Sequence, residues 1–262
     1  MSAVRLQGLA AGYGDPPVVD GLELELPPGA TLALVGTNGS GKSTILRTLA
    51  GLLDPRSGTV EVLGGRPGRS PEKLAYLAQF HVNGLLLPIR AREIVSMGRF
   101  AGKGLLGRMG TDDRVAVREA LERMGVLDLA NQPLRDLSGG QQQRVFVAQA
   151  LARQADLLLL DEPAAGLDAA GQDLLAAALA AERDRGATIV VATHDIGDAM
   201  RADLVLLLAR RVVALGPPSA VLTPEALQET FGHALRTLAG GVLVMDSAHG
   251  HGEHDPVDGH HH

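Results

Sequence analysis

Apolar positions along the chain follow two different periods, which predict strands separated by helices. Residues 22–26 read L-E-L-E-L, the strict alternation of a half-buried strand. Strands that alternate with helices favour a parallel sheet, so we expect an α/β fold. Short β-type runs and segments of helical spacing predict strands at 22–26, 31–35, 58–63, 75–77, 157–161, 188–193, 204–208 and 212–215, and helices at 42–52, 169–185 and 196–200.

The middle of the chain departs from this alternation. Three helical patterns, at residues 91–97, 112–124 and 138–153, follow one another without a strand between them. We therefore expect a helical insertion, at about residues 80–155, in the α/β core. A glycine-rich stretch at 100–110 predicts a mobile loop within it. In the second helix the apolar residues expected to face inward are Val115, Ala116, Leu121 and Met124.

Composition excludes several classes of function. The chain has 262 residues and no cysteine, which rules out disulfides, thiolate metal sites and a cysteine nucleophile. Aromatic residues are 2% and the formal net charge is −6, so we expect no nucleic-acid partner. No apolar run approaches the length of a membrane span, and the first residues lack the pattern of a signal peptide. These features predict an α/β protein of the cytosol.

A phosphate-binding loop is predicted between the strand at 31–35 and the helix that starts at Lys42. The segment G-T-N-G-S-G-K-S has the spacing in which glycines turn backbone N–H groups toward phosphate oxygens. Lys42 is one of only three lysines, yet it occupies the position that reaches the β- and γ-phosphates. The candidate residues for nucleotide binding are Gly36, Asn38, Gly39, Ser40, Gly41, Lys42, Ser43 and Thr44, and Ser43 is also a candidate Mg²⁺ ligand.

Two carboxylates end the apolar strand at 157–161. The sequence L-L-L-L-D-E-P places Asp161 where it can hold Mg²⁺ and Glu162 where it can orient and deprotonate a water molecule. A buried strand that simply ends at the surface would also carry charges there. The phosphate-binding loop favours the functional interpretation, because an apolar strand that ends in two carboxylates is the expected second half of such a phosphate site.

A third motif, L-S-G-G-Q-Q-Q-R at 137–144, makes the assignment specific. Ser138 and Gln141 have the spacing of a capping box, and Gly139 and Gly140 leave N–H groups open to an anion at the helix start. With this motif the chain resembles the ATP-binding-cassette (ABC) ATPases from about residue 3 to 240. The resemblance implies a P-loop NTPase (RecA-like) core, an N-terminal antiparallel β subdomain and an inserted α-helical subdomain. We expect one domain at 1–240 and a disordered tail at 241–262.

The resemblance also implies roles for single residues. Tyr13 occupies the position of an aromatic residue that packs against adenine, and Gln79 that of a loop glutamine that contacts Mg²⁺ and water. Asp168 matches a loop that crosses the dimer interface, and His194 matches a histidine that touches the γ-phosphate. Three of the four have a structural alternative: a strand aromatic for Tyr13, a helix N-cap for Asp168 and a structural strand-end residue for His194.

The family implied by these motifs works as head-to-tail homodimers. Each ATP, with Mg²⁺, lies between the phosphate loop of one subunit and the Ser138–Gln141 segment of the other. The resemblance implies an integral membrane permease as partner, an extracytoplasmic substrate-binding protein acting indirectly, and a location on the inner face of the cytoplasmic membrane. The helical insertion is the expected docking surface for the permease.

The cargo is less specified. Residues 85–99 resemble the corresponding segment of ATPases that serve zinc or manganese uptake, although ATPases for iron chelates share part of it. A non-transport ABC protein usually has two cassettes or a coiled-coil insertion, which this chain lacks. A regulator without turnover is disfavoured by the intact Asp161, Glu162 and His194.

The last seventeen residues carry six of the nine histidines and four of the acids. Imidazoles with carboxylates suit Zn²⁺, Ni²⁺ or Cu²⁺, so this tail predicts weak zinc binding that ATP hydrolysis does not need. An expression tag at 260–262 and a merely solvated polar tail are the alternatives. Most of the negative charge belongs to the tail and does not oppose ATP binding by the rest of the chain.

Overall fold

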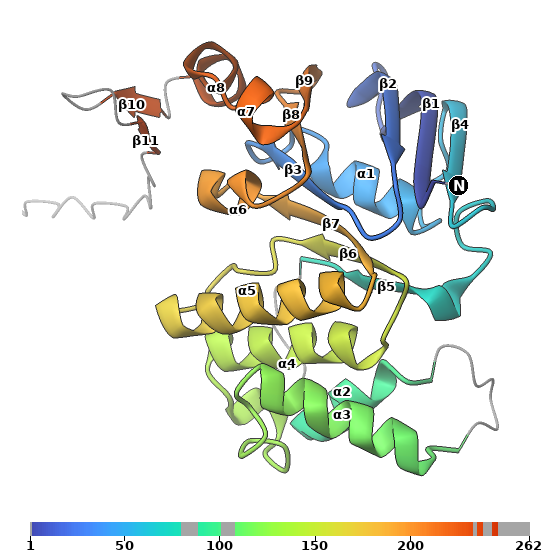
Figure 1. Ribbon diagram of the computed structural model, residues 1–262, viewed down its shortest axis with the longest axis vertical. Helices are drawn as coiled ribbons and strands as arrows, with labels where there is room; N and C mark the ends of the chain where they lie inside the picture. The colour runs from blue at the N-terminus through green and yellow to red at the C-terminus, as the bar shows by residue number, and fades with distance from the viewer. Residues whose placement is uncertain (1, 80–88, 101–107, 233–234, 238–242, 246–262) are drawn as a thin grey trace, which may run out of the picture.

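A six-stranded sheet is the centre of the fold (Figure 1). The structure is a computed structural model, and it describes residues 2–79, 89–100, 108–232, 235–237 and 243–245. The first five strands of the order β5-β6-β7-β3-β8-β9 are parallel, while β9 runs antiparallel to β8. The chain reverses between them at residues 209–211, and so short a connection cannot return a parallel strand. The strands are β3 (Thr31–Gly36), β5 (Leu74–Leu77), β6 (Leu157–Asp161), β7 (Thr188–Thr193), β8 (Leu204–Leu208) and β9 (Val212–Gly216).

Both faces of this sheet are buried, which explains the continuous apolar runs in its strands. In β6, Leu157 and Leu159 pack into a cluster with helix α1 (Lys42–Leu49). Leu158 and Leu160 point to the opposite face, where they pack with α4 (Gly139–Ala152) and α5 (Ala169–Asp184). The sheet is thereby covered on both sides, as the α/β prediction requires.

A second sheet is antiparallel and is built from the N-terminal part of the chain. Its order is β2-β1-β4, formed by β1 (Val4–Ala11), β2 (Val19–Leu26) and β4 (Ser57–Val62). The leucines of L-E-L-E-L are buried, and Glu23 and Glu25 between them are exposed. This sheet lies beside α1 (Figure 1) and confirms the expected antiparallel β subdomain.

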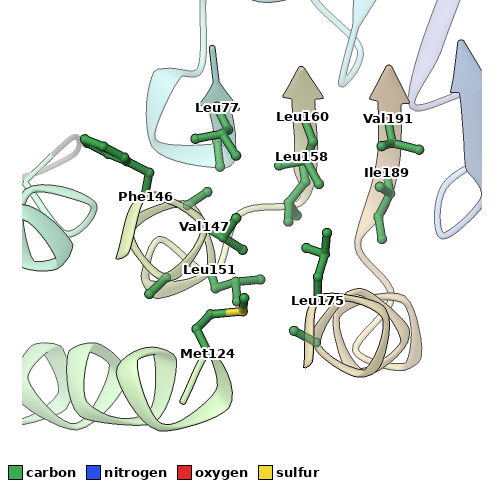
Figure 2. Close-up of a cluster of buried hydrophobic side chains, with 14 of the residues drawn as sticks. Leu77, Met124, Phe146, Val147, Leu151, Leu158, Leu160, Leu175, Ile189 and Val191 are labelled. Carbon is green, nitrogen blue, oxygen red and sulfur yellow. The ribbon is translucent and has the colours of Figure 1, made fainter. Parts of the chain in front are cut away.

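Three helices lie between β5 and β6 in the sequence: α2 (Ala91–Met97), α3 (Thr111–Arg123) and α4. They stack on the side of α5 that faces away from the N-terminal sheet (Figure 1). Figure 2 shows Met124 at the end of α3 close to Leu151 of α4, with Leu175 of α5 facing the same cluster. The arrangement supports the insertion at about 80–155, whose boundaries stay a prediction.

Two expectations are wrong in detail. Helix α1 ends at Leu49 instead of residue 52, because Gly51 turns the chain with φ +74° and leaves Leu52 66% exposed. Val115 is exposed on α3, and Val117 is buried in its place, because the inward face follows the row of Val117, Leu121 and Met124. Strand β11 (Leu243–Met245), which pairs with β10 (Leu235–Thr237), lies inside the range 241–262 whose disorder stays a prediction.

The remaining helices all follow β7, and two 3₁₀ turns precede β5 and α4. They are α6 (Ile196–Met200), α7 (Pro218–Val221), α8 (Pro224–Phe231), and two 3₁₀ turns at Pro71–Lys73 and Leu134–Asp136. Within the described ranges, no helix is long and apolar enough to cross a bilayer. The histidine-rich residues 246–262, and parts of the segments at 85–99 and 100–110, lie outside the described residues.

Candidate nucleotide-binding site

The predicted motifs meet at one edge of the large sheet because they follow the carboxyl ends of parallel strands. The glycine-rich loop follows β3, Gln79 lies just after β5, and Asp161 ends β6. His194 follows β7, the strand between β6 and β3. Segments far apart in the sequence therefore share one edge, where a small ligand can touch all of them.

The glycine-rich loop is shaped by two positions that exclude a side chain. A Cβ at Gly36 would lie 2.2 Å from the Leu208 carbonyl oxygen, and Gly41 has φ +112° beside Val19. Gly41 is the N-cap of α1 and supplies no side-chain cap, so N–H groups of the first turn are left for another acceptor. Such a helix start suits a phosphate, whose charge also complements the helix dipole.

Lys42 lies across the loop and is 5% exposed. Its Nζ donates to the carbonyl oxygens of Gly36 (2.7 Å) and Thr37 (3.1 Å) and lies 3.8 Å from Glu162 Oε1. Burial lowers the pKa of Lys42, and the carboxylates of Glu162 and Asp161 oppose the shift. The ammonium is thus poorly hydrated, and a phosphate oxygen would gain a strong electrostatic partner there.

Two carboxylates face the loop from β6. Burial raises the pKa of Asp161, and hydrogen bonding by the Ser43 hydroxyl partly offsets it. Glu162 has φ +49°, a conformation rare for residues other than glycine and often found at functional sites. Its Oε2 accepts a 3.1 Å hydrogen bond from Gln79 Nε2. The structure therefore brings Lys42, Ser43, Asp161, Glu162 and Gln79 together, as the sequence motifs require.

Two other candidate residues lie at the border of this cluster. His194 is exposed, and in the part of the chain that the structure describes it makes no hydrogen bond to the cluster. Tyr13 lies after the end of β1, not in a strand, and is 65% exposed. Its hydroxyl accepts a 3.2 Å hydrogen bond from Arg47 Nη1 of α1, which ties the ring to the helix of the phosphate loop. An exposed, tethered ring is suited to stacking on a base.

The start of α4 forms a second candidate anion site. Ser138 caps the helix by accepting from Gln141 N–H, and Gln141 Oε1 accepts in return from Ser138 N–H. Ser138 and Gly139 are exposed, while a Cβ at Gly140 would lie 2.9 Å from the Gly166 carbonyl oxygen. The capping box and a solvent-facing helix start therefore coexist, as the sequence indicated.

The loop after Glu162 joins the two candidate sites. Gln143 Nε2 donates to the Pro163 carbonyl oxygen at 3.0 Å, which fastens the first half of α4 to this loop. Asp168 ends the loop as the N-cap of α5, accepting from Gly171 N–H at 2.9 Å, and it remains exposed. Asp168 is thus a helix N-cap, which is its structural alternative. The cap uses Oδ1, and within the described residues Oδ2 accepts no hydrogen bond.

Sequence reasoning missed Arg47 and Gln143. Arg47 is four residues after Ser43 and so shares its helix face, a spacing that would have indicated a residue near the site. Gln143 lies inside the motif at 137–144, two residues after Gln141, and its partner is a backbone carbonyl from a distant loop. No local sequence pattern predicts such a contact.

The residues present fit a nucleotide phosphate and a hard cation. The glycine cradle, a buried lysine and an uncapped helix start are the donors that a phosphate requires. Ser43, Gln79 and Asp161 offer hydroxyl, amide and carboxylate oxygens, the ligand types that Mg²⁺ prefers.

Comparison with known proteins agrees with this geometry. Residues 19–165 match the ABC transporter family. The manganese transport system ATP-binding protein MntB of Bacillus subtilis (strain 168) is 37% identical over 254 residues, which is 97% of this chain and 100% of that protein. The zinc transport system ATP-binding protein TroB of Treponema pallidum (strain Nichols) is 36% identical over 231 residues, 88% of this chain and 87% of that protein.

Solved structures show the same fold. An inward-facing conformation of a putative metal-chelate type ABC transporter has a TM-score of 0.77 and 28% identity, covering 93% of this chain and 96% of that chain. The ADP conformation of an ATP-binding cassette, MJ1267, has a TM-score of 0.73 at 19% identity, which bears on the fold alone. The chain belongs to the ABC transporter family as one of its ATP-binding, ATP-hydrolysing subunits, which operate with a membrane permease and generally as dimers.

Proposed function

We propose that this chain binds Mg-ATP at the Gly36–Thr44 loop and uses its hydrolysis to drive uptake of a divalent metal ion, zinc or manganese, through a separate permease on the inner face of the cytoplasmic membrane. The observation that carries the ATPase site is the convergence of Lys42, Glu162 and Gln79. Lys42 Nζ lies 3.8 Å from Glu162 Oε1, and Gln79 Nε2 lies 3.1 Å from Glu162 Oε2.

The residues of this cluster divide the work of phosphoryl transfer. Lys42 exchanges the carbonyl oxygens of Gly36 and Thr37 for the β- and γ-phosphates of ATP. Glu162 takes the proton of the attacking water on its carboxylate, while Gln79 orients that carboxylate through Oε2. Ser43, Gln79 and Asp161 would hold Mg²⁺, which when bound supplies positive charge to the phosphate oxygens. His194 contacts the γ-phosphate, and Tyr13 stacks on the adenine.

The second half of the site comes from another copy of the chain. The Ser138–Gln141 helix start, with Gly139 and Gly140, binds the γ-phosphate of ATP held by the phosphate loop of the partner, and Asp168 lies at the shared interface. The exposure of Ser138 and Gly139 supports this arrangement, because it leaves the start of α4 accessible to a phosphate held by another chain. ATP then favours the closed head-to-tail homodimer, and its cleavage removes the bridging phosphate.

The proposal that the cargo is a metal ion rests on the names of similar proteins. MntB of Bacillus subtilis is named for manganese transport and TroB of Treponema pallidum for zinc transport. Each is similar to this chain over most of its length. A metal chelate is the alternative cargo, favoured by the metal-chelate type transporter that shares the fold at 28% identity. An extracytoplasmic substrate-binding protein would deliver either cargo to the permease.

Growth of a deletion strain tests the cargo. We expect the strain to grow poorly when zinc or manganese is scarce, to recover with the wild-type gene and to remain impaired with Glu162→Gln. Rescue by an iron chelate but by neither metal ion would support the alternative cargo. Normal growth under every limitation, combined with Mg-ATP hydrolysis by the purified chain, would reject metal uptake while leaving the ATPase assignment intact.

A further inference from the structure

A buried ionic cluster lies on α5, at the end opposite to Asp168. Glu182 is 2% exposed, and its carboxylate lies between two arginines. Oε1 accepts from Arg123 Nη1 at 2.7 Å, and Oε2 accepts from Arg185 Nε at 3.0 Å and Nη2 at 2.7 Å. Three charge-assisted hydrogen bonds to this buried carboxylate hold the two partly exposed arginines in one geometry.

Each arginine connects α5 to a different part of the chain. Arg123, the last residue of α3, also donates from Nη2 to the Ala178 carbonyl oxygen of α5 at 2.6 Å. Arg185 donates from Nη2 to the Ala155 carbonyl oxygen at 2.5 Å, in the connection from α4 to β6. Glu182 on α5 is thus tied to the end of α3, and through Arg185 to the connection by which the chain returns from α4 to the sheet.

The same turn is also tied to α4. Two residues after Arg123, the Gly125 carbonyl oxygen accepts from Arg144 Nη1 of α4 at 3.4 Å. A Cβ at Gly125 would lie 3.0 Å from Leu174 of α5, so the turn fits tightly against that helix. Residues 123–125 therefore link α5, which packs on the sheet, to α4, whose first residues are Gly139 and Gly140.

We propose that Arg123, Glu182 and Arg185 form a clamp that sets the position of the α4 start relative to Asp161 and Glu162. Glu182 and Arg123 are positioning residues: they touch no nucleotide, and they act through α4. The proposal rests on the proposed function, in which that helix start captures the ATP of a partner subunit. A loosened clamp is expected to leave the phosphate loop intact and to weaken only the capture, because the hydrogen bonds of Arg123 and Arg185 join α3, α5 and the α4–β6 connection, whereas the phosphate loop joins β3 to α1.

The test uses the full chain carrying Glu162→Gln, in which ATP is expected to accumulate the dimer. Light scattering follows dimer formation against ATP concentration, and calorimetry follows ADP binding to the single chain. Arg123→Met is expected to raise the ATP concentration for half-maximal dimerisation by about fivefold or more and to leave the ADP affinity unchanged. Arg123→Lys keeps a positive charge but loses the planar guanidinium that bonds to two acceptors. Its ATP concentration for half-maximal dimerisation is expected to lie between those of the Arg123 parent and Arg123→Met.

Arg183→Met is the matched control, because Arg183 is on the same helix but makes an exposed ion pair with Asp203 at 2.8 Å. It is expected to change neither measurement. The clamp is rejected if Arg123→Met and Arg123→Lys need the same ATP concentration for half-maximal dimerisation as Arg183→Met. It is also rejected if they lower the affinity for ADP by as large a factor as they raise that ATP concentration. Absence of any ATP-driven dimer in Glu162→Gln alone would reject the proposed function instead.

Discussion

The two candidate phosphate sites of this chain differ in how complete they are. The loop at 36–43 is enclosed: Lys42 is buried, and Asp161 and Glu162 face it from β6. The start of α4 is open: Ser138 and Gly139 are exposed, and the side-chain partner there is Gln141 of the same capping box. Both are helix N-termini with glycines, so the difference lies in what the sheet brings to them.

This contrast indicates a division of roles. The enclosed site has a buried ammonium, two carboxylates and further oxygen groups, so it can bind and polarise a phosphate within one chain. The open site offers helix N–H groups alone, whose attraction for an anion is weak when exposed to water. In the proposed head-to-tail dimer it acts on a phosphate that another chain already holds.

The largest effect is expected for Lys42→Ala. Loss of the ammonium removes the main positive side chain beside the phosphates and leaves Asp161 and Glu162 facing the nucleotide, so hydrolysis should fall by about 1,000-fold. Phosphate release from Mg-ATP measures it. Lys73→Ala, in the exposed turn before β5, is the matched control and should keep wild-type activity. Equal rates for the two variants would remove Lys42 from the mechanism.

Glu162→Gln should lower hydrolysis by about 100-fold, because the amide cannot accept the water proton. The amide oxygen still accepts from Gln79, so ATP should bind and hold the dimer. Phosphate release and light scattering with ATP separate the two effects. Turnover close to that of the wild type would show that Glu162 is not the base.

Mixing two defective chains tests the division most directly. Lys42→Ala disables the enclosed site and Ser138→Arg the open one, so each variant alone should be inactive. In a head-to-tail heterodimer one composite site keeps both intact halves. An equimolar mixture should regain about a quarter of the wild-type rate, since half the dimers are mixed and each has one working site. A mixture as inactive as its components would place both halves in the same chain.

The smallest effect concerns the N-cap of α5. Asp168→Ala removes the acceptor for Gly171 N–H and should lower the free energy of unfolding by about 1 kcal/mol. Urea denaturation measures it, with Asp173→Ala on the exposed side of α5 as the control. Asp168→Asn should keep the stability, because asparagine caps equally well. A loss of hydrolysis in Asp168→Asn at full stability would separate the interface role from the cap.

Local patterns in the sequence predicted most of the fold. The alternation at 22–26, the apolar runs at 31–35 and 157–161 and the capping box at Ser138 are all present, since each depends on neighbours a few residues away. The end of α1 and the inward face of α3 were misjudged, because Gly51 and the packing of Val117 decide them. The antiparallel direction of β9 follows from its pairing with β8, which composition does not reveal.

The sequence by itself determined the chemistry of the candidate site. Gly36, Lys42, Asp161 and Glu162 are specified by spacing, because each motif is a strand end followed by a turn or helix start. The tertiary structure decided which groups meet. Parallel pairing brings Gln79 to Glu162 across 83 positions of the chain, and the packing of α3 on α5 brings Arg123 to Glu182 across 59. Such contacts depend on how the sheet and helices pack, and no short-range pattern encodes them.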